Sequence, residues 1–195
     1  MAVTLVTGPV RSGKSRYVMA LATASLRRVR YVATAVRDPG DGEWDTRLQR
    51  HMSDRPDNWE SIEAASLGHD ALLDIFRSAQ PDECIIVDAL GTWLAARIAT
   101  NIEAMERNFA AFEAQMDGEA AELATAMLDS RARVVIVAEE VGWDIVPVAA
   151  SARLFRDVLG RVKQRLAAES DDVYLVVCGY ALDLKALGVT IASAT

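Results

Sequence analysis

The chain has 195 residues, about half of them apolar and a quarter charged, and its formal net charge is −7. This length predicts one domain over residues 1–195, with a core large enough to fold without disulfides or structural metal ions. The acidic balance and the absence of a Lys/Arg block argue against nucleic acid as the main partner. No apolar run approaches the ~18 residues of a membrane span, and no signal-peptide pattern is seen. We therefore expect no membrane anchor and a cytoplasmic location.

The order of apolar segments predicts the fold class. Strands are expected at 3–7, 29–33, 84–87, 134–138 and 173–178, with a further short strand within 187–195. Helices are expected at about 14–26, 44–55, 68–79, 103–130 and 151–169. The strand segments are mostly continuous apolar runs, which is typical of strands that are covered on both faces. The alternation predicts an α/β fold with a mostly parallel sheet and helices on both faces.

Two features of these segments invite a functional interpretation, and packing explains both. In 103–130, Met105, Phe109, Phe112 and Met116 recur at helical spacing, which indicates an apolar stripe packed on the sheet or on another subunit. Cys84 and Cys178 each lie in an apolar run without a Cys-x-x-Cys pair. Both are expected to be small buried thiols rather than metal ligands.

The first strand leads into a glycine-rich segment that ends in Lys-Ser. It fits the pattern GxxxxGK[ST] and consists of Gly8, Pro9, Val10, Arg11, Ser12, Gly13, Lys14 and Ser15. Glycines allow successive N–H groups to point at phosphate oxygens, and the following helix adds its positive end. Lys14 can reach the β- and γ-phosphates, and the Ser15 hydroxyl can bind Mg²⁺. The alternative is an ordinary strand-to-helix turn.

The strand at 84–87 ends on Asp88. Ligands of parallel α/β sheets bind beyond the carboxyl ends of the strands, so Asp88 could hold Mg²⁺ directly or through water. An aspartate after an apolar strand is common, and the interpretation depends on its pairing with the phosphate loop.

A histidine between two arginines is the third candidate for chemistry. If 44–55 is helical, Arg47, His51 and Arg55 lie near one face at i, i+4 and i+8. Neighbouring guanidinium groups favour the neutral, nucleophilic imidazole and can grip phosphate oxygens. This pattern suits attack of the imidazole on phosphorus to give a phosphoramidate. A solvated surface histidine between surface arginines is the alternative.

Together these motifs resemble the bifunctional adenosylcobinamide kinase / adenosylcobinamide-phosphate guanylyltransferase family of cobalamin assembly. The resemblance is carried, in chain order, by TGPVRSGKS, YVATA, RLQRHMSDRPDNWESIE, VDALGTWL, EVGWDIVP and ARLFRDVLGRVKQRLA. It extends from residue 4 to about residue 179. Most of these motifs are unspecific alone, but their shared order is highly specific.

The resemblance implies a RecA-like P-loop fold and two reactions. ATP or GTP would phosphorylate adenosylcobinamide, with Lys14 as a catalytic residue. GMP from GTP would then be joined to adenosylcobinamide phosphate through a guanylylated histidine, which corresponds to His51. Mg²⁺ would be held at Ser15 and Asp88, and a homo-oligomer, often a trimer, is implied. The implied nucleotide contacts are residues 8–15, Thr34, Ala35, Val36, Met52, Ser53, Asp54, Arg55, Glu63 and Asp88.

The chain departs from the family pattern mainly in 139–164. Glu139 and Lys163 each stand where the family usually has Asn, and we expect the two side chains to form a compensating ion pair. If they do not pair, Glu139 near the crevice would repel phosphates. The phosphate loop and the His51 segment match the pattern, so nucleotide binding is expected to be less affected than acceptor recognition.

Other functions fit parts of the pattern. A P-loop kinase could act on another small alcohol, with His51 only binding phosphate and no guanylyl transfer. A RecA-like motor or a nucleotide-sensing module would need a polymer track or a partner surface, which the acidic charge disfavours. Intact Lys14, Ser15 and Asp88 argue against a structural module with a decayed loop.

Overall fold

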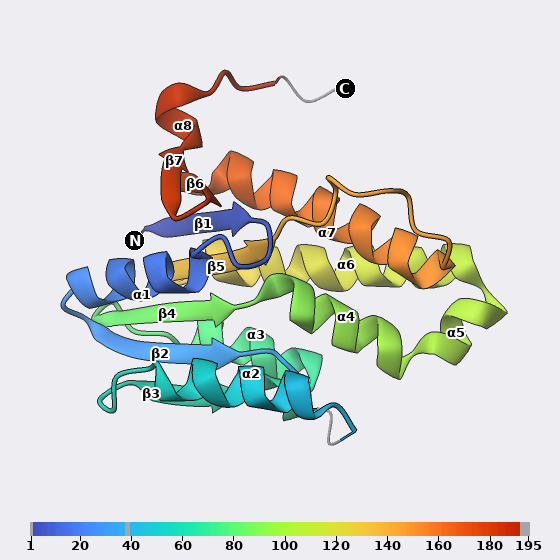
Figure 1. The fold of residues 1–195 in the computed structure, drawn as a ribbon, viewed down its shortest axis with the longest axis horizontal. Coiled ribbons are helices and arrows are strands. Elements are labelled where there is room, and N and C mark those ends of the chain that lie inside the picture. The colour runs from blue at the N-terminus through green and yellow to red at the C-terminus, as the bar shows by residue number, and fades with distance from the viewer. Residues whose placement is uncertain (1, 38–39, 192–195) are drawn as a thin grey trace.

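A computed structural model describes residues 2–37 and 40–191 and shows one seven-stranded sheet with helices on both faces (Figure 1). The strand order is β3-β2-β4-β5-β1-β6-β7, parallel except for the antiparallel pair β6–β7. This is the predicted fold class. The strands are β1 (Val3–Gly8), β2 (Arg28–Ala33), β3 (Glu60–Glu63), β4 (Glu83–Asp88), β5 (Arg133–Glu139), β6 (Asp172–Val177) and β7 (Tyr180–Asp183).

The helices connect these strands largely as the sequence predicts. They are α1 (Lys14–Ala24), α2 (Gly42–Ser53), α3 (His69–Arg77), α4 (Leu90–Thr100), α5 (Ile102–Arg107), α6 (Phe109–Leu128), α7 (Ala150–Glu169) and α8 (Leu184–Leu187), with a 3₁₀ turn at Ala64–Ser66. The five predicted strands are confirmed to within about one residue at each end. Differences of this size are usual for the ends of strands and helices.

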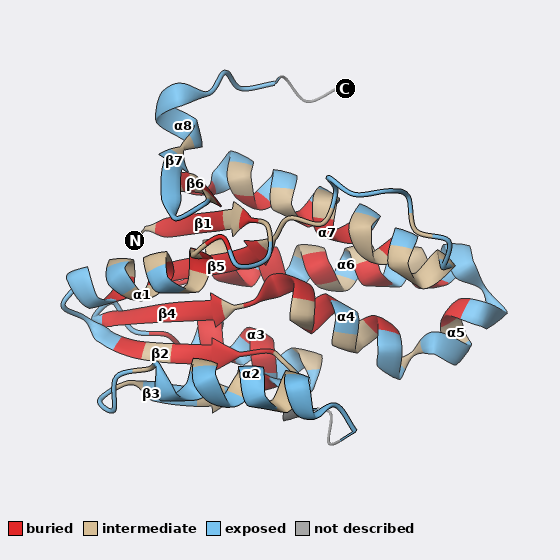
Figure 2. Cartoon of the chain, in the orientation of Figure 1, coloured by how far each residue is buried: buried red, intermediate tan, exposed pale blue. Residues whose placement is uncertain are grey.

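Successive residues of the strands alternate between two cores, as a pleated sheet requires. On one face, Leu5, Ile85 and Ile136 pack with α3, α4, α6 and α7. On the other, Val6 and Ile86 pack with α1. The central strands are buried along nearly their whole length, whereas α2 buries none of its residues (Figure 2). This double cover explains why the strands lack polar alternation in the sequence.

The predicted helix at 103–130 is in fact two helices. Asn108 is extended between α5 and α6, with φ −155°, and its side chain accepts a hydrogen bond from the Ala111 N–H at 3.1 Å. Met105, Phe112 and Met116 are buried, but Phe109 at the start of α6 is 41% exposed and is therefore not packed in the core of this chain. Since α6 packs on α3 and α7, the stripe is covered by this chain itself.

Several elements were missed or misplaced. β3, α4, β7 and α8 were not predicted, because they are short, charged or continuous with a neighbouring motif. Residues 187–191 contain no strand, and the rest of the predicted tail strand, 192–195, lies outside the described residues. The antiparallel strand at this edge is β7 instead.

The two cysteines differ in their environments. Cys84 in β4 is buried, as expected, but Cys178 is exposed. Cys178 follows the end of β6, with φ 52°, in the turn that leads to β7. The apolar run therefore stops one residue earlier than the sequence suggested.

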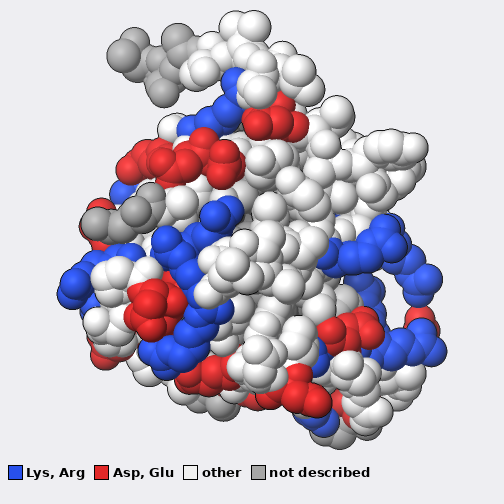
Figure 3. All heavy atoms as spheres, turned by 90° about the vertical axis from the view of Figure 1, so that its left-hand side faces the viewer, with Lys and Arg blue, Asp and Glu red and all other residues white. Residues whose placement is uncertain are grey.

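The sequence argues against nucleic acid as the main partner and against a membrane anchor, and two features of the structure concern these expectations. On the face shown in Figure 3, basic side chains form separate groups, each bordered by acidic side chains. Within residues 2–37 and 40–191, no helix combines the length and apolar character needed to cross a bilayer.

The cap at Asn108 predicts a measurable contribution to stability. Asn108→Ala removes the acceptor for the Ala111 N–H and should lower the free energy of unfolding by about 1 kcal/mol. Asn108→Ser keeps a capping oxygen and should remain within a few tenths of a kcal/mol of the wild type. Urea denaturation measures both, and equal losses in the two variants would contradict a capping role.

Candidate functional site

The phosphate-loop segment forms a tight turn between β1 and α1, and its glycines are required by geometry. Gly8 has φ 152°, and a Cβ there would lie 2.2 Å from the carbonyl oxygen of Val176. Gly13, the residue before α1, has φ 104°. Any side chain at Gly8 would therefore displace either the loop or β6, which accounts for the first glycine of the motif.

Lys14 and Ser12 give the turn the character of an anion site. The Lys14 ammonium is buried and donates to the carbonyl oxygens of Gly8 at 2.8 Å and Pro9 at 2.7 Å. Burial lowers its pKa, although Glu139 and Asp88 act in the opposite direction. The Ser12 Oγ is buried and has no hydrogen-bond partner within the described residues. A buried ammonium and an unused hydroxyl beside a helix N-terminus fit a phosphate group.

Asp88 ends β4 and lies on the same edge of the sheet as this loop. Its Oδ2 accepts a hydrogen bond from the Tyr31 hydroxyl. Among the described residues, no cluster of three His, Cys, Asp or Glu side chains could enclose a metal ion. A few protein oxygens such as those of Asp88 and Ser15 suit Mg²⁺, which keeps several waters and is completed by nucleotide phosphates.

The segment with His51 comes from a different part of the chain. Asp41 caps α2 by accepting from Glu43 and Trp44, and the helix ends at Ser53. Arg55 therefore lies beyond the helix, and the predicted i+8 relation was wrong. The Arg55 side chain is only 8% exposed, and its guanidinium lies 3.5 Å from the Glu63 carboxylate.

The phosphate loop, Asp88 and the His51 segment line a single cavity of about 980 Å³. Of the predicted site residues, those that line it are Val10, Arg11, Ser12, Gly13, Lys14, Ser15, Ala35, His51, Met52, Asp54, Arg55, Glu63 and Asp88. Because both groups of residues face one space, a nucleotide at the loop and the imidazole of His51 can share it.

Five predicted contacts, Gly8, Pro9, Thr34, Val36 and Ser53, are not among the lining residues. Gly8 and Pro9 act through their carbonyl groups on Lys14. The Thr34 hydroxyl is buried against the Ala89 carbonyl at 2.6 Å. The Val36 carbonyl accepts from the Trp44 indole at 2.8 Å, and the Ser53 hydroxyl bonds within α2. These residues shape the walls around the cavity.

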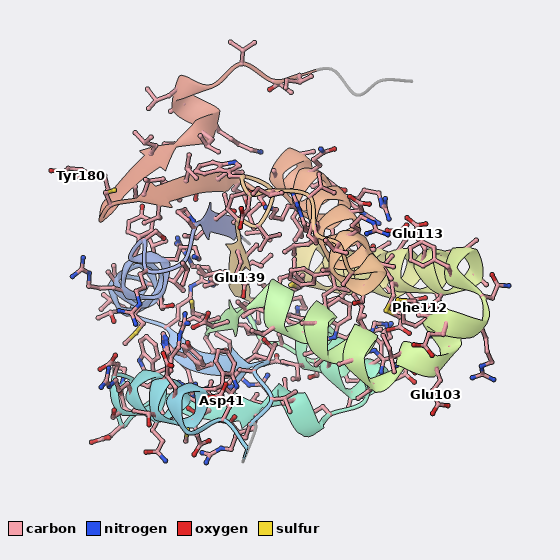
Figure 4. All side chains as sticks on the ribbon, turned by 45° about the vertical axis from the view of Figure 1, so that its right-hand side comes forward. Asp41, Glu103, Phe112, Glu113, Glu139 and Tyr180 are labelled. Atoms are coloured by element: carbon pink, nitrogen blue, oxygen red, sulfur yellow. The ribbon has the colours of Figure 1, made fainter. Side chains whose placement is uncertain are left out.

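The expected ion pair between Glu139 and Lys163 was wrong in its acidic partner. Lys163 Nζ donates to Oε2 of Glu140 at 2.7 Å and to the main-chain oxygen of Glu139 at 3.1 Å. The Glu139 carboxylate instead accepts from the Gly91 N–H at 2.9 Å, at the start of α4. Figure 4 shows Glu139 inside the molecule, where the strands end. The reason is alternation along the chain, since adjacent residues at a strand end point in different directions.

The pKa values of the two glutamates are therefore shifted in opposite directions. Burial raises the pKa of Glu139, and Asp88 adds to this effect, while main-chain N–H groups and Lys14 oppose it. Burial also acts to raise the pKa of Glu140, but hydrogen bonds from Lys163 and the Gly142 N–H outweigh it and leave that pKa lowered. Glu139 lines the cavity beside the phosphate loop, so its charge bears on the phosphates.

Sequence reasoning missed several lining residues, among them Tyr31, Thr92 and Glu140. Tyr31 belongs to the motif YVATA, and its position two residues before the end of β2 is the signal that could have identified it. Thr92 belongs to α4, which was itself missed.

Comparison with known proteins decides the family. The model of the family described as "Cobinamide kinase / cobinamide phosphate guanyltransferase" matches residues 4–184. The chain belongs to this family. Its description names both a kinase and a nucleotidyltransferase activity, so the predicted resemblance is confirmed over most of the chain.

Curated members of the cobinamide kinase family align with the chain over nearly their whole length. A bifunctional adenosylcobalamin biosynthesis protein, CobU, of Salmonella typhimurium strain LT2 is 38% identical over 186 residues, covering 93% of this chain and 98% of that protein. CobU of Escherichia coli K12 is 36% identical, with 93% and 98% covered. CobP of Pseudomonas aeruginosa PAO1 is 32% identical, with 93% and 96% covered.

Solved structures support the P-loop NTPase fold of the family. An ATPase from the type III secretion system of pathogenic bacteria superimposes with a TM-score of 0.60 at 8% identity. The alignment covers 97% of this chain and 59% of that ATPase, so the chain spans about three-fifths of its length. An ATP synthase subunit, NeqB, of Nanoarchaeum equitans gives a TM-score of 0.50, with 97% and 52% covered. At such low identity the likeness concerns the fold alone.

The family membership confirms the predicted bifunctional activity. The enzyme is a cobinamide kinase and cobinamide phosphate guanylyltransferase of adenosylcobalamin biosynthesis. A kinase for another alcohol, without guanylyl transfer, finds no support in these comparisons.

The opposite pKa shifts predict opposite effects of two substitutions. A raised native pKa means that the contribution of Glu139 to stability is present below its ordinary pKa and is lost as the pH rises. Glu139→Gln should therefore gain free energy of unfolding relative to the wild type as the pH rises above about 4.5. The Gln oxygen can still accept from the Gly91 N–H.

Glu140→Gln is the matched control with the reverse sign. The lowered native pKa of Glu140 stabilises the fold above the ordinary pKa, and this contribution is lost on acidification. Relative to the wild type, Glu140→Gln should therefore lose stability as the pH rises toward about 4.5, and the deficit should stay constant above that pH. Urea denaturation at several pH values measures both differences. Parallel curves for the two variants would rule out the assigned environments.

Proposed function

We propose that residues 1–195 form one domain that performs both reactions of the family in the single cavity, with His51 as the guanylylated residue. The observation that supports this proposal is that His51 and the phosphate-binding turn line the same space. One triphosphate seated at the turn could then serve either as phosphoryl donor or as GMP donor, depending on which of its phosphorus atoms is attacked.

In the kinase step, the loop and Lys14 would hold the phosphates of ATP or GTP. The hydroxyl oxygen of adenosylcobinamide forms a bond to the γ-phosphorus and gives up its proton to water. The bond from that phosphorus to the bridging oxygen breaks, and the nucleoside diphosphate leaves. Lys14 and the N–H groups stabilise the charge on the transferred group. Mg²⁺ held by Ser15 and Asp88 would supply further neutralisation of the phosphate oxygens.

In the transferase step, the imidazole of His51 would attack the α-phosphorus of GTP. An N–P bond forms, the bond to the β-phosphate breaks, and pyrophosphate leaves. A phosphate oxygen of adenosylcobinamide phosphate then attacks the same phosphorus. The N–P bond breaks, and adenosylcobinamide-GDP and the free imidazole result. Arg47 and Arg55, which line the cavity, would bind the phosphate oxygens during both transfers.

The proposed nucleotide contacts keep the predicted set. They are Gly8, Pro9, Val10, Arg11, Ser12, Gly13, Lys14, Ser15, Thr34, Ala35, Val36, Met52, Ser53, Asp54, Arg55, Glu63 and Asp88. The proposal also keeps a cytoplasmic location, because ATP and GTP are supplied there.

Replacing single residues separates the two reactions. His51→Ala should abolish incorporation of GMP into the protein and synthesis of adenosylcobinamide-GDP while phosphorylation of adenosylcobinamide continues. Lys14→Ala should lower phosphorylation by about a hundredfold or more, because the ammonium at the phosphates is lost. Intact mass after exposure to GTP, followed by peptide mapping, locates the adduct, and a coupled assay follows the kinase.

The chain offers a matched control for the histidine. It contains only two histidines, and His69 lies apart from the cavity, with Nε2 at 3.0 Å from the Glu122 carboxylate. His69→Ala should form the adduct normally. An adduct that persists in His51→Ala would refute the proposed nucleophile, and guanylyl transfer without any protein adduct would favour direct transfer.

We also propose a homotrimer, as the family resemblance implies. Since the stripe of α5 and α6 is covered within the chain, the contact needs another apolar surface. The antiparallel edge offers one, because Tyr180 of β7 is 77% exposed and Leu187 of α8 is 73% exposed. Figure 4 shows Tyr180 projecting away from the body of the molecule. β7 is also the end strand of the sheet, with one edge unpaired within the described residues.

Light scattering after size exclusion should give about three times the 21.2 kDa mass of one chain. Replacing both Tyr180 and Leu187 by Asp should shift the mass toward that of a monomer, since charges would be buried at the contact. Glu106→Lys, on the exposed part of α5, serves as a control for changed surface charge. A monomeric wild type, or a trimeric double variant, would contradict this assignment.

A further inference from the structure

We propose that Tyr31 is a positioning residue that couples the Asp88 carboxylate to the Arg55 guanidinium, and so fixes two sides of the cavity relative to each other. The inference rests on the proposed function for the roles of Asp88 and Arg55. Neither the motif chemistry nor the family comparison assigns a role to Tyr31, which is buried and contributes to the cavity wall.

The strand register brings Tyr31 to Asp88. In the parallel pair β2–β4, Ala33 lies opposite Asp88 and Tyr31 lies opposite Ile86. Residues two apart on a strand share a face, so Tyr31 is on the same face as Asp88 and one step behind it. A tyrosine is long enough to span that step, and its hydroxyl donates to Oδ2 of Asp88. One carboxylate oxygen is thereby held in place, while Oδ1 receives no hydrogen bond from Tyr31.

The same ring also holds Arg55. The guanidinium carbon of Arg55 lies 4.0 Å from the centre of the Tyr31 ring. The Trp59 ring is stacked beside Tyr31, with the ring centres 6.5 Å apart and an angle of 27° between the ring planes. The Nη1 of Arg55 donates to the Ser61 hydroxyl at 3.2 Å. A guanidinium placed over an aromatic face in a partly dry site is held in orientation by cation–π attraction.

Arg55 keeps unused hydrogen-bonding capacity in this position. Its Nε is buried and has no hydrogen-bond partner within the described residues. A buried, unpartnered N–H costs free energy unless a ligand completes it, and Arg55 lines the cavity that also contains His51. An anionic group such as a nucleotide phosphate is the chemistry that would satisfy this donor.

The role assigned to Tyr31 is therefore to orient two groups that would contact the ligands. Its hydroxyl acts on the proposed metal carboxylate, and its ring acts on an arginine of the guanylylation segment. Burial, reinforced by Asp88, raises the pKa of Tyr31, so the hydroxyl stays protonated and remains a donor. The two parts of the side chain can be removed separately, which makes the coupling testable.

Tyr31→Phe removes the hydroxyl and keeps the ring under Arg55. The Mg²⁺ concentration for half-maximal formation of the GMP adduct should rise by about tenfold, as for loss of a hydrogen bond to a charged group. The rate at saturating Mg²⁺ should stay within about twofold of wild type. Tyr31→Leu removes the ring as well, so its rate should stay low even at saturating Mg²⁺.

Three comparisons distinguish positioning from a structural role. Tyr174→Phe removes a tyrosine hydroxyl beside the same core, against the Tyr17 ring and away from the cavity, and should match wild type. In an Asp88→Asn background, adding Tyr31→Phe should have little further effect, because the carboxylate it orients is gone. Thermal unfolding with GTP, with and without Mg²⁺, gives a readout independent of turnover, and Tyr31→Phe should reduce only the Mg²⁺-dependent part of the stabilisation.

A wild-type Mg²⁺ response in Tyr31→Phe, in both adduct formation and thermal unfolding, would overturn the assignment to Asp88. Full recovery of Tyr31→Leu at saturating Mg²⁺ would overturn the assignment to Arg55. If the wild type forms no adduct, the proposed role of His51 fails instead, and the Mg²⁺-dependent stabilisation by GTP still decides whether Tyr31 acts on Asp88.

Discussion

The in-register parallel pairing of five adjacent strands, β3-β2-β4-β5-β1, is the constraint on which this site depends. Gly8 lies opposite Glu139, and Ala33 lies opposite both Asp88 and Glu63. These residues are far apart in the chain, yet each is the last residue of its strand. The carboxyl ends of parallel strands lie at the same edge of the sheet. The strand pairing alone therefore brings together the phosphate turn, the proposed metal carboxylate Asp88, and the carboxylates of Glu139 and Glu63. A slip of one residue would turn the same side chains toward the opposite face.

Burial gives the charges at this edge their strength and also their cost. Within the part of the chain that the structure describes, the Lys14 ammonium donates to carbonyl oxygens of its own loop, and the Glu139 carboxylate accepts from a helix N–H. Neither has an ion-pair partner within 4.0 Å in the described part of the chain, in contrast to Lys163 with Glu140. Groups held in this way destabilise the unliganded protein, and they interact strongly with a ligand that brings phosphate and a cation.

The His51 helix is attached differently from the rest of the fold. α2 contributes no buried residue, and polar contacts such as the Trp44 indole on the Val36 carbonyl hold its start. Its other end leads to Arg55, which is fixed by Tyr31, Ser61 and Glu63. The proposed nucleophile His51 thus lies on a helix that contributes no buried residue to the core. Arg55, four residues further along the chain, is held in place by several contacts. Substitutions on α2 can change the chemistry at small cost to folding.

The fold class, the central strands, the phosphate turn and the family could all be predicted from the sequence. These follow from local signals: continuous β-branched runs, glycines at a strand end, and Lys-Ser at the start of a helix. It also proposed His51 and Asp88, because their motifs have a recognisable chemical composition. Phe109, the break at Asn108 and the end of the run at Cys178 show the limit of periodicity, since one capping residue or one turn redirects a pattern that looks continuous.

Which side chains face one another depends on the folded arrangement of the strands and helices. Glu139 and Glu140 are neighbours in the chain, and the sequence gives no means to tell which one meets Lys163 and which one meets Gly91. Tyr31 reads as one more apolar residue of a buried strand until the β2–β4 register places its hydroxyl on Asp88 and its ring under Arg55. Such contacts join residues more than twenty positions apart through strand order and side-chain direction, and neither of these is encoded within a local window of sequence.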